Sequence, residues 1–211
     1  MVCITNNPDG SREYKNDFPT KPEDQKLDIQ QGVLYKTKFY LAGAMQNDSS
    51  GNNWRIEAEK ELSNMGIFCF NPYLKPFLDS DKLEEGNEAH QLFKTWMKEG
   101  RLDLVAERMK PIRNFDLNCI DRADAVICKI NPNVPTWGTP EELSLCSQIR
   151  RPTFIFIEGG REFCPYWILA MFNPKYIYNS LDEIINVLKD INSGKESINN
   201  DKWRLLKPQF R

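Results

Sequence analysis

The sequence has little of what many catalytic and metal sites are built from. His90 is its only histidine, and none of its six cysteines forms a CxxC pair. A zinc site and a Ser-His-Asp triad are therefore both disfavoured, and we expect neither a metal nor a cofactor. Any catalysis in this chain is expected to depend on carboxylates.

The sequence also lacks an excess of charge and a long apolar run. Its formal net charge is −2, so no global field draws it to duplex nucleic acid or to an anionic membrane. Apolar runs such as 154–157 are far too short to span a bilayer. The opening stretch MVCITNNPDGSREYKNDFP has no secretory signal pattern, and cysteines within apolar runs suit a reducing compartment. We therefore expect a cytoplasmic protein.

Three regions follow from the composition along the chain. Residues 1–33 are polar and have no sustained period, which predicts a loosely ordered extension. Residues 34–192 carry the apolar patterns of a folded domain, and residues 193–211 form a polar tail.

Strand-like and helix-like patterns alternate through the central region. This alternation predicts an α/β fold, namely a flavodoxin/Rossmann-like, doubly wound, five-stranded parallel sheet. Ligands of such sheets bind beyond the carboxyl ends of the strands. The expected strands are 36–42, 67–70, 125–130, 153–157 and 175–178; the expected helices are 54–65, 83–109 with an interruption at Gly100, 112–122, 139–149, a short one around Trp167, and 181–191.

The loop that follows the first predicted strand is rich in small and amide residues. Residues 43–53 could cradle an anion at a helix N-terminus, with Arg55 as a charged partner. The loop matches neither GxGxxG nor a P-loop, so ATP and NAD have no specific support. A plain surface turn is an equally good interpretation.

Acidic residues gather on both sides of the predicted strand 125–130. Asp124 directly precedes this strand, where a role in a turn is favoured, and Asp116 on the preceding helix suits a solvated face. In "GTPEEL", Glu141 and Glu142 also suit an ordinary helix start. Successive residues of a helix are about 100° apart, so only one of these two glutamates can face the strand ends.

Several motifs together resemble one family. In order along the chain they are "FYLAG", "WR", "DLNCIDRADAVI", "GTPEEL" and "RRPTFIFI". Their order and spacing are similar to those of the nucleoside 2-deoxyribosyltransferases, a family that includes related nucleoside 5′-monophosphate N-glycosidases. The resemblance covers about residues 36–157 and extends more loosely to 191.

The resemblance implies a mechanism and a substrate. Glu142 matches the family nucleophile that attacks C1′ of the sugar, Asp116 matches the acid that protonates the departing base, and Tyr40 matches the tyrosine that positions the glutamate. Retaining glycosidases use the same two-carboxylate chemistry. The implied substrate is a (2′-deoxy)nucleoside or a nucleoside 5′-monophosphate. The implied assembly is a homo-oligomer, for which an apolar stripe on the helix 83–109 offers a surface: Leu92, Phe93, Trp96 and Met97.

The substrate contacts implied by the resemblance show departures from the family. Thr136 stands where transferases have an aspartate for the sugar 5′-hydroxyl and hydrolases have a serine for the 5′-phosphate. Ala44 stands where hydrolases tend to have a phosphate-binding serine. Transfer and hydrolysis therefore both stay open, as does a catalytically inactive nucleotide-binding or partner-binding module on the same fold. The substrate-binding candidates are Gly43, Ala44, Arg55, Asp124, Thr136 and Gly138.

Overall fold

The computed structural model describes residues 2–6, 12–16, 32–45, 51–76 and 87–196, which belong to two compact units, 1–30 and 31–211. In the first unit, strands β1 (Val2–Asn6) and β2 (Arg12–Asn16) pair in an antiparallel hairpin. The sequence predicted no strand here, because the alternation in these two segments is too short to register as a sustained period.

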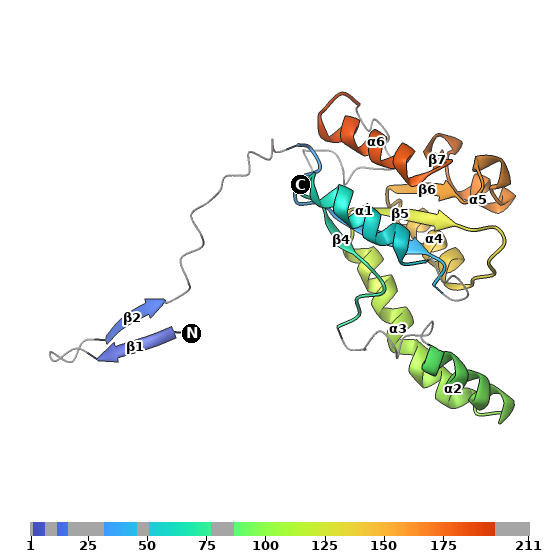
Figure 1. Cartoon of the computed structure of the whole chain (residues 1–211), viewed down its shortest axis with the longest axis horizontal. Coiled ribbons are helices and arrows are strands. Elements are labelled where there is room, and N and C mark those ends of the chain that lie inside the picture. Colours follow the sequence, from blue (N-terminus) through green and yellow to red (C-terminus); the bar gives the residue numbers. More distant parts are fainter. Residues whose placement is uncertain (1, 7–11, 17–31, 46–50, 77–86, 197–211) are drawn as a thin grey trace. The chain divides into compact units, whose positions relative to one another are not determined.

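The second unit is built on a sheet of five parallel strands (Figure 1). Its order β4-β3-β5-β6-β7 places the first strand of this unit between the second and the third, which is the flavodoxin-like order. This result confirms the predicted fold class. The strands are β3 (Lys38–Gly43), β4 (Phe68–Phe70), β5 (Ala125–Ile130), β6 (Thr153–Ile157) and β7 (Ile177–Tyr178).

Helices cover both faces of this sheet (Figure 1). Alternate residues of a strand point to opposite faces, so Phe39 and Leu41 pack with α1 and α6, whereas Tyr40 and Ala42 pack with α3, α4 and α5. Helix α2 packs on α3. The helices are α1 (Asn53–Ser63), α2 (Asn87–Lys98), α3 (Leu102–Arg122), α4 (Gly138–Gln148), α5 (Tyr166–Met171) and α6 (Leu181–Asn192), with 3-10 turns at Arg161–Phe163 and Pro174–Tyr176.

Helix α3 differs from its prediction. The interruption at Gly100 is confirmed, since this glycine lies between α2 and α3 with a φ of 72°. The second break, expected between 109 and 112, is wrong because α3 continues through Pro111. A proline removes one helix hydrogen bond, but buried residues on its C-terminal side, Ile112 and Ile120, anchor the helix against the sheet.

None of the helices in the described parts of the chain is long and apolar enough to cross a bilayer.

Candidate functional site

A buried hydrogen bond joins β3 to the start of α4. The hydroxyl of Tyr40 donates to Oε1 of Glu142 at 2.6 Å, and both side chains are buried. The neighbouring Glu141 lies at the surface, where Nε of Arg113 donates to its Oε2 at 2.8 Å. The structure thus separates the two adjacent acids as helix geometry requires, and Glu142 is the one that faces the sheet.

The environment of Glu142 makes it a weaker acid than usual. Burial is the main cause that raises its pKa to about 7, and the negative charge of Asp116 raises it further. The hydrogen bond from Tyr40 and the positive charges of Arg55 and Lys75 act in the opposite direction. Glu142 therefore exchanges its proton near neutral pH, and its pKa is among the features that distinguish catalytic carboxyl groups.

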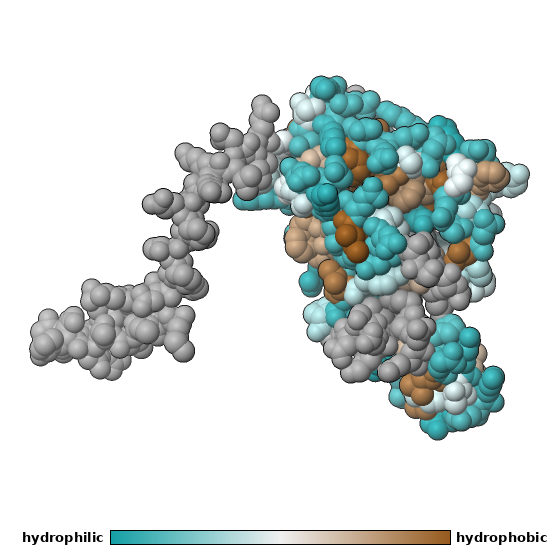
Figure 2. Space-filling view, in the orientation of Figure 1, coloured by the Kyte–Doolittle hydropathy of each residue, from teal (hydrophilic) through white to brown (hydrophobic). Residues whose placement is uncertain are grey.

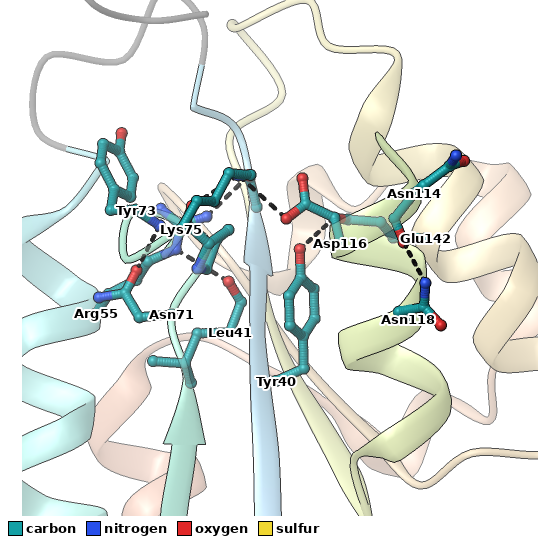
Figure 3. A network of polar contacts seen from close by, with 12 residues as sticks. Tyr40, Leu41, Arg55, Asn71, Tyr73, Lys75, Asn114, Asp116, Asn118 and Glu142 are labelled. Atoms are coloured by element: carbon teal, nitrogen blue, oxygen red, sulfur yellow. Dashed lines mark hydrogen bonds and ion pairs between the residues drawn. The ribbon is translucent and has the colours of Figure 1, made fainter. Parts of the chain in front are cut away.

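Asp116 reaches the same place from α3. Figure 3 shows the Asp116 carboxylate close to the Tyr40 hydroxyl and to Glu142, near the carboxyl end of β3. Its Oδ1 lies 3.1 Å from Nζ of Lys75, whose side chain is wholly buried. Lys75 also donates to the carbonyl of Pro72 at 2.7 Å. The three predicted catalytic residues are thus brought together, and a lysine joins them.

Sequence reasoning missed Lys75. It lies in the segment that follows β4, and in "NPYLKPF" it stands between apolar residues and prolines. A lysine in such surroundings was the available signal, because a lysine is rarely fully buried without a partner. The position of that partner, Asp116, depends on the fold and is not visible in the sequence.

Backbone carbonyls fix the position of Arg55. Its guanidinium is fully buried under the loop after β3, where Nε donates to the carbonyl of Leu41 at 3.0 Å and Nη2 to that of Gly43 at 2.9 Å. Nη1 donates to the carbonyl of Gly51. The rings of Trp54 and Tyr73 lie within cation–π distance of it. Arg55 is therefore a structural tie for this loop, and its assignment as a charged partner for a bound anion stays a prediction.

Gly43 is required by the backbone at the end of β3. Its φ is 148°, and a Cβ at this position would lie 3.0 Å from the carbonyl oxygen of Lys129. A larger residue would be strained and would push β3 away from β5. The glycine thus allows close contact of the two strands at the point where their order in the sheet reverses.

Asp124 lies at the opposite end of the sheet. Its Oδ2 accepts a hydrogen bond from the backbone N–H of Lys38 at 2.8 Å, and its own N–H donates to the carbonyl of Lys38 at 2.7 Å. These bonds tie the amino ends of β3 and β5 together. These bonds give Asp124 a structural role, as its place before the strand favoured, and its assignment to substrate binding stays a prediction.

A cavity of about 370 Å³ lies between the end of β5, the start of α4, and α5. Ala44, Thr136, Thr139 and Leu143 contribute to its wall, and so does the largely exposed Trp167. Tyr40, Asp116 and Glu142 do not line it. The carboxylates thus lie outside the cavity, although Leu143, the residue after Glu142, contributes to its wall.

Two of the remaining candidates, Ala44 and Thr136, thus share one cavity, although they are far apart in sequence. Gly138 begins α4, where a Cβ would meet no other atom within 4 Å. The hydroxyl of Thr136 lies 3.5 Å from that of Thr139. Helix α4 begins one residue before Thr139 and has no side-chain cap, so Thr139 does not cap it.

Within the described ranges, no group of three or more His, Cys, Asp or Glu side chains could hold a metal ion.

Comparisons with known proteins give a match in structure. No protein-family model matches the sequence, and a search of curated proteins finds no significant match. A 2-deoxyribosyltransferase from Bacillus psychrosaccharolyticus matches with a TM-score of 0.51 and 20% identity over 71% of this chain and 90% of that chain. A 2-deoxyribosyltransferase from Leishmania mexicana gives a TM-score of 0.40 and 16% identity over 59% of this chain and 67% of that chain. The chain thus has the α/β fold of a 2-deoxyribosyltransferase, the family that its motifs resemble.

Proposed function

We propose that this protein cleaves the N-glycosidic bond of a (2′-deoxy)nucleoside or nucleoside 5′-monophosphate through a glycosyl-Glu142 intermediate, by base exchange or by hydrolysis. The observation that carries the proposal is the buried hydrogen bond between Tyr40 and Glu142, with Asp116 beside it near the carboxyl end of β3. The fold shared with a 2-deoxyribosyltransferase supports it.

The proposed reaction needs the two carboxyl groups in different states. Ionised Glu142 attacks C1′ of the sugar, and the C1′–N bond breaks with its electron pair passing to the base. Protonated Asp116 transfers its proton to a nitrogen of the departing base. A second base, or water, then attacks C1′, passes its proton to the Asp116 carboxylate and releases Glu142 from the ester as a carboxylate. Throughout, Tyr40 holds the oxygen of Glu142 that it contacts.

The substrate contacts form a second part of the proposal. The sugar lies over the carboxylates, with the backbone of Gly43 at the end of β3 beside it. Its 5′ group points toward the cavity wall, where Ala44 and Thr136 lie, near Gly138 at the start of α4. Because Thr136 offers a hydroxyl and no charge, both a 5′-hydroxyl and a 5′-phosphate fit this assignment.

The test is the release of free base. The protein is incubated with each deoxynucleoside and each deoxynucleoside 5′-monophosphate, with and without a second base, and the products are separated by chromatography. Free base without acceptor indicates hydrolysis, and a new nucleoside indicates transfer. Absence of both products would contradict the proposal and favour the inactive nucleotide-binding module, which equilibrium dialysis with the same ligands would then examine.

Replacing Tyr40 should change the pH dependence of the reaction. Its hydrogen bond lowers the pKa of Glu142 from the value that burial alone would impose. Tyr40→Phe removes this bond, so the pKa of Glu142 should rise above about 7. The reacting form carries one proton on the pair of acids, and Glu142 titrates above Asp116, whose carboxylate Lys75 favours. The alkaline limb of the kcat/KM profile should therefore move to higher pH, by about one unit for a bond worth about 1.4 kcal/mol. An unmoved alkaline limb would contradict the role given to Tyr40.

We also propose that the protein acts as a homo-oligomer in the cytoplasm. In the apolar stripe of α2, Phe93 is buried, whereas Leu92 and Met97 are exposed. Figure 2 shows a small hydrophobic area among hydrophilic residues over this helix. Exposed apolar clusters are common at subunit interfaces. Light scattering at micromolar concentration should report a dimer or a larger species, and Leu92→Glu with Met97→Glu should reduce it. A monomeric wild-type protein would contradict the proposal.

The proposed location in the cytoplasm rests on the cysteines. Free thiols at Cys69, Cys119 and Cys146 suit a reducing compartment.

A further inference from the structure

Lys75 contacts one of the two carboxylates from a part of the chain that the proposed reaction has not used. It lies in the segment after β4, whereas Asp116 lies on α3 and Glu142 on α4. Its ammonium donates to the carbonyl of Pro72 at 2.7 Å and lies 3.1 Å from Oδ1 of Asp116. The carbonyl fixes the ammonium in place, and the ammonium in turn fixes the carboxylate (Figure 3).

We propose that Lys75 is a positioning residue that holds Asp116 in its ionised form in the free protein and thereby sets the pH range of base release. This inference rests on the proposed function. Lys75 is not assigned to the reacting atoms, because its side chain is wholly buried and contacts the protein's own groups. It acts through Asp116, the group that has to gain a proton before the base can leave.

The physical reason is the proximity of the two charges in a buried place. An opposite charge within about 4–6 Å favours the ionised form of a carboxyl group by about 1–3 pH units. Burial of either charge without the other would be costly, so each stabilises the charged form of its partner. At 3.1 Å from Asp116, Lys75 lies well inside this range.

Other titratable groups around Asp116 act differently from Lys75. The pKa values of Tyr40 and Cys119 are raised, by burial first and then by nearby carboxylates, so both groups are neutral at ordinary pH. The guanidinium of Arg55 is bound to backbone carbonyls. Glu142 carries a negative charge when ionised and would favour a proton on Asp116. Lys75 therefore opposes the effect of Glu142.

In the free protein, the proton of the Glu142 and Asp116 pair therefore lies on the opposite carboxyl group from the one that carries it in the reaction. In the free protein, burial raises the pKa of Glu142 to about 7, while Lys75 favours the carboxylate of Asp116. The proton shared by the two acids therefore resides mainly on Glu142. Attack needs that proton on Asp116 instead. By opposing this transfer, Lys75 controls how much of the protein is ready to react at a given pH.

Replacement of Lys75 should move the pH profile upward. The reacting form carries one proton on the pair of acids. Asp116 titrates below Glu142 in the wild type, so the acidic limb follows Asp116, and loss of Lys75 moves this limb to higher pH by about 1–3 units. Lys75 also lowers the pKa of Glu142, as the weakest of its stated causes. The alkaline limb should therefore move in the same direction by a smaller amount, and the profile should narrow.

The experiment uses five variants of the full chain. Lys75→Met removes the charge, and Lys75→Gln also does so but keeps a donor, in case methionine prevents folding. Lys75→Arg keeps the charge and should keep the wild-type profile. Lys189→Met is the control, because its lysine pairs with Glu61 on the α1 and α6 side of the sheet. For each protein, base release is measured against pH, and the carboxyl carbon of Asp116 is titrated by NMR, with Asp116→Asn to assign its signal.

The two measurements separate this inference from the proposed function. An upward change of the Asp116 titration and of the acidic limb in Lys75→Met or Lys75→Gln, absent in Lys75→Arg and Lys189→Met, supports the inference. An unchanged titration overturns it, whatever the activity. If the Asp116 titration changed in the Lys75 variants but the wild-type protein released no base from any substrate, the proposed function would be contradicted, and with it the catalytic part of the inference. A changed titration with an unmoved profile would likewise overturn that part.

Discussion

Glu142→Gln should reduce base release on the order of 10⁴-fold or more, while Glu141→Gln should leave it within about threefold of the wild type. The amide of glutamine cannot form the ester with C1′, so the covalent path is lost. Its carbonyl still accepts the hydrogen bond that Tyr40 now donates to Oε1 of the glutamate. The two variants should be compared at saturating substrate, near the pH optimum of the wild type.

The neighbouring glutamate is a matched control. Glu141 differs from Glu142 by one position in the same helical turn, but it pairs with Arg113 at the surface. Surface ion pairs contribute little to stability, so Glu141→Gln should fold. Glu142→Gln should also fold, because it keeps the hydrogen bond from Tyr40. Circular dichroism and urea unfolding would check both. If Glu141→Gln lost activity and Glu142→Gln kept it, the assignment of the nucleophile would be wrong. In acid-quenched wild-type protein, mass spectrometry should find the glycosyl group on the peptide that contains Glu142.

The fold could be predicted from the sequence because its signals are local. Alternating strand and helix patterns, each a few residues to a few turns long, are enough to predict a parallel sheet with helices on both faces. The error at Pro111 arose because a local rule was applied without knowledge of the packing around it. The break expected at Pro111 ignored the burial of Ile112 and Ile120, which anchor α3 to the sheet. Tertiary packing outweighs local preference at such positions.

The site could be predicted only in part. Helix geometry shows that one of Glu141 and Glu142 faces the sheet, and the family resemblance selects Glu142, which the structure places against Tyr40. No pattern in the sequence indicates that Arg55 would be bound by the backbone carbonyls of Leu41, Gly43 and Gly51. The contact of Lys75 with Asp116 joins segments that are distant in sequence. Charged residues can be found from sequence, but their partners depend on the fold.

Replacing Thr136 should change which substrate is preferred. Its hydroxyl lies in the wall of the cavity near the start of α4, where backbone N–H groups favour an anion. Because the guanidinium of Arg55 is bound to backbone carbonyls, Thr136 and this helix start are the groups that would bind a 5′-phosphate. We predict that the wild-type protein processes deoxynucleoside 5′-monophosphates better than free deoxynucleosides, because no carboxylate occupies position 136.

Thr136→Asp should reverse this order. A carboxylate next to a phosphate costs several kcal/mol, which lowers kcat/KM for monophosphates by roughly 10²-fold or more, whereas a free 5′-hydroxyl can donate a hydrogen bond to it. Thr136→Asn has nearly the same shape as the aspartate variant without its charge, so it should keep the wild-type order. Parallel measurements of kcat/KM for one deoxynucleoside and its monophosphate decide the matter. If the asparagine variant reversed the order as well, side-chain size would be responsible instead of charge. If the wild type ignored monophosphates and exchanged bases between free deoxynucleosides, the 5′-phosphate prediction would fail while the proposed cleavage of the N-glycosidic bond would stand.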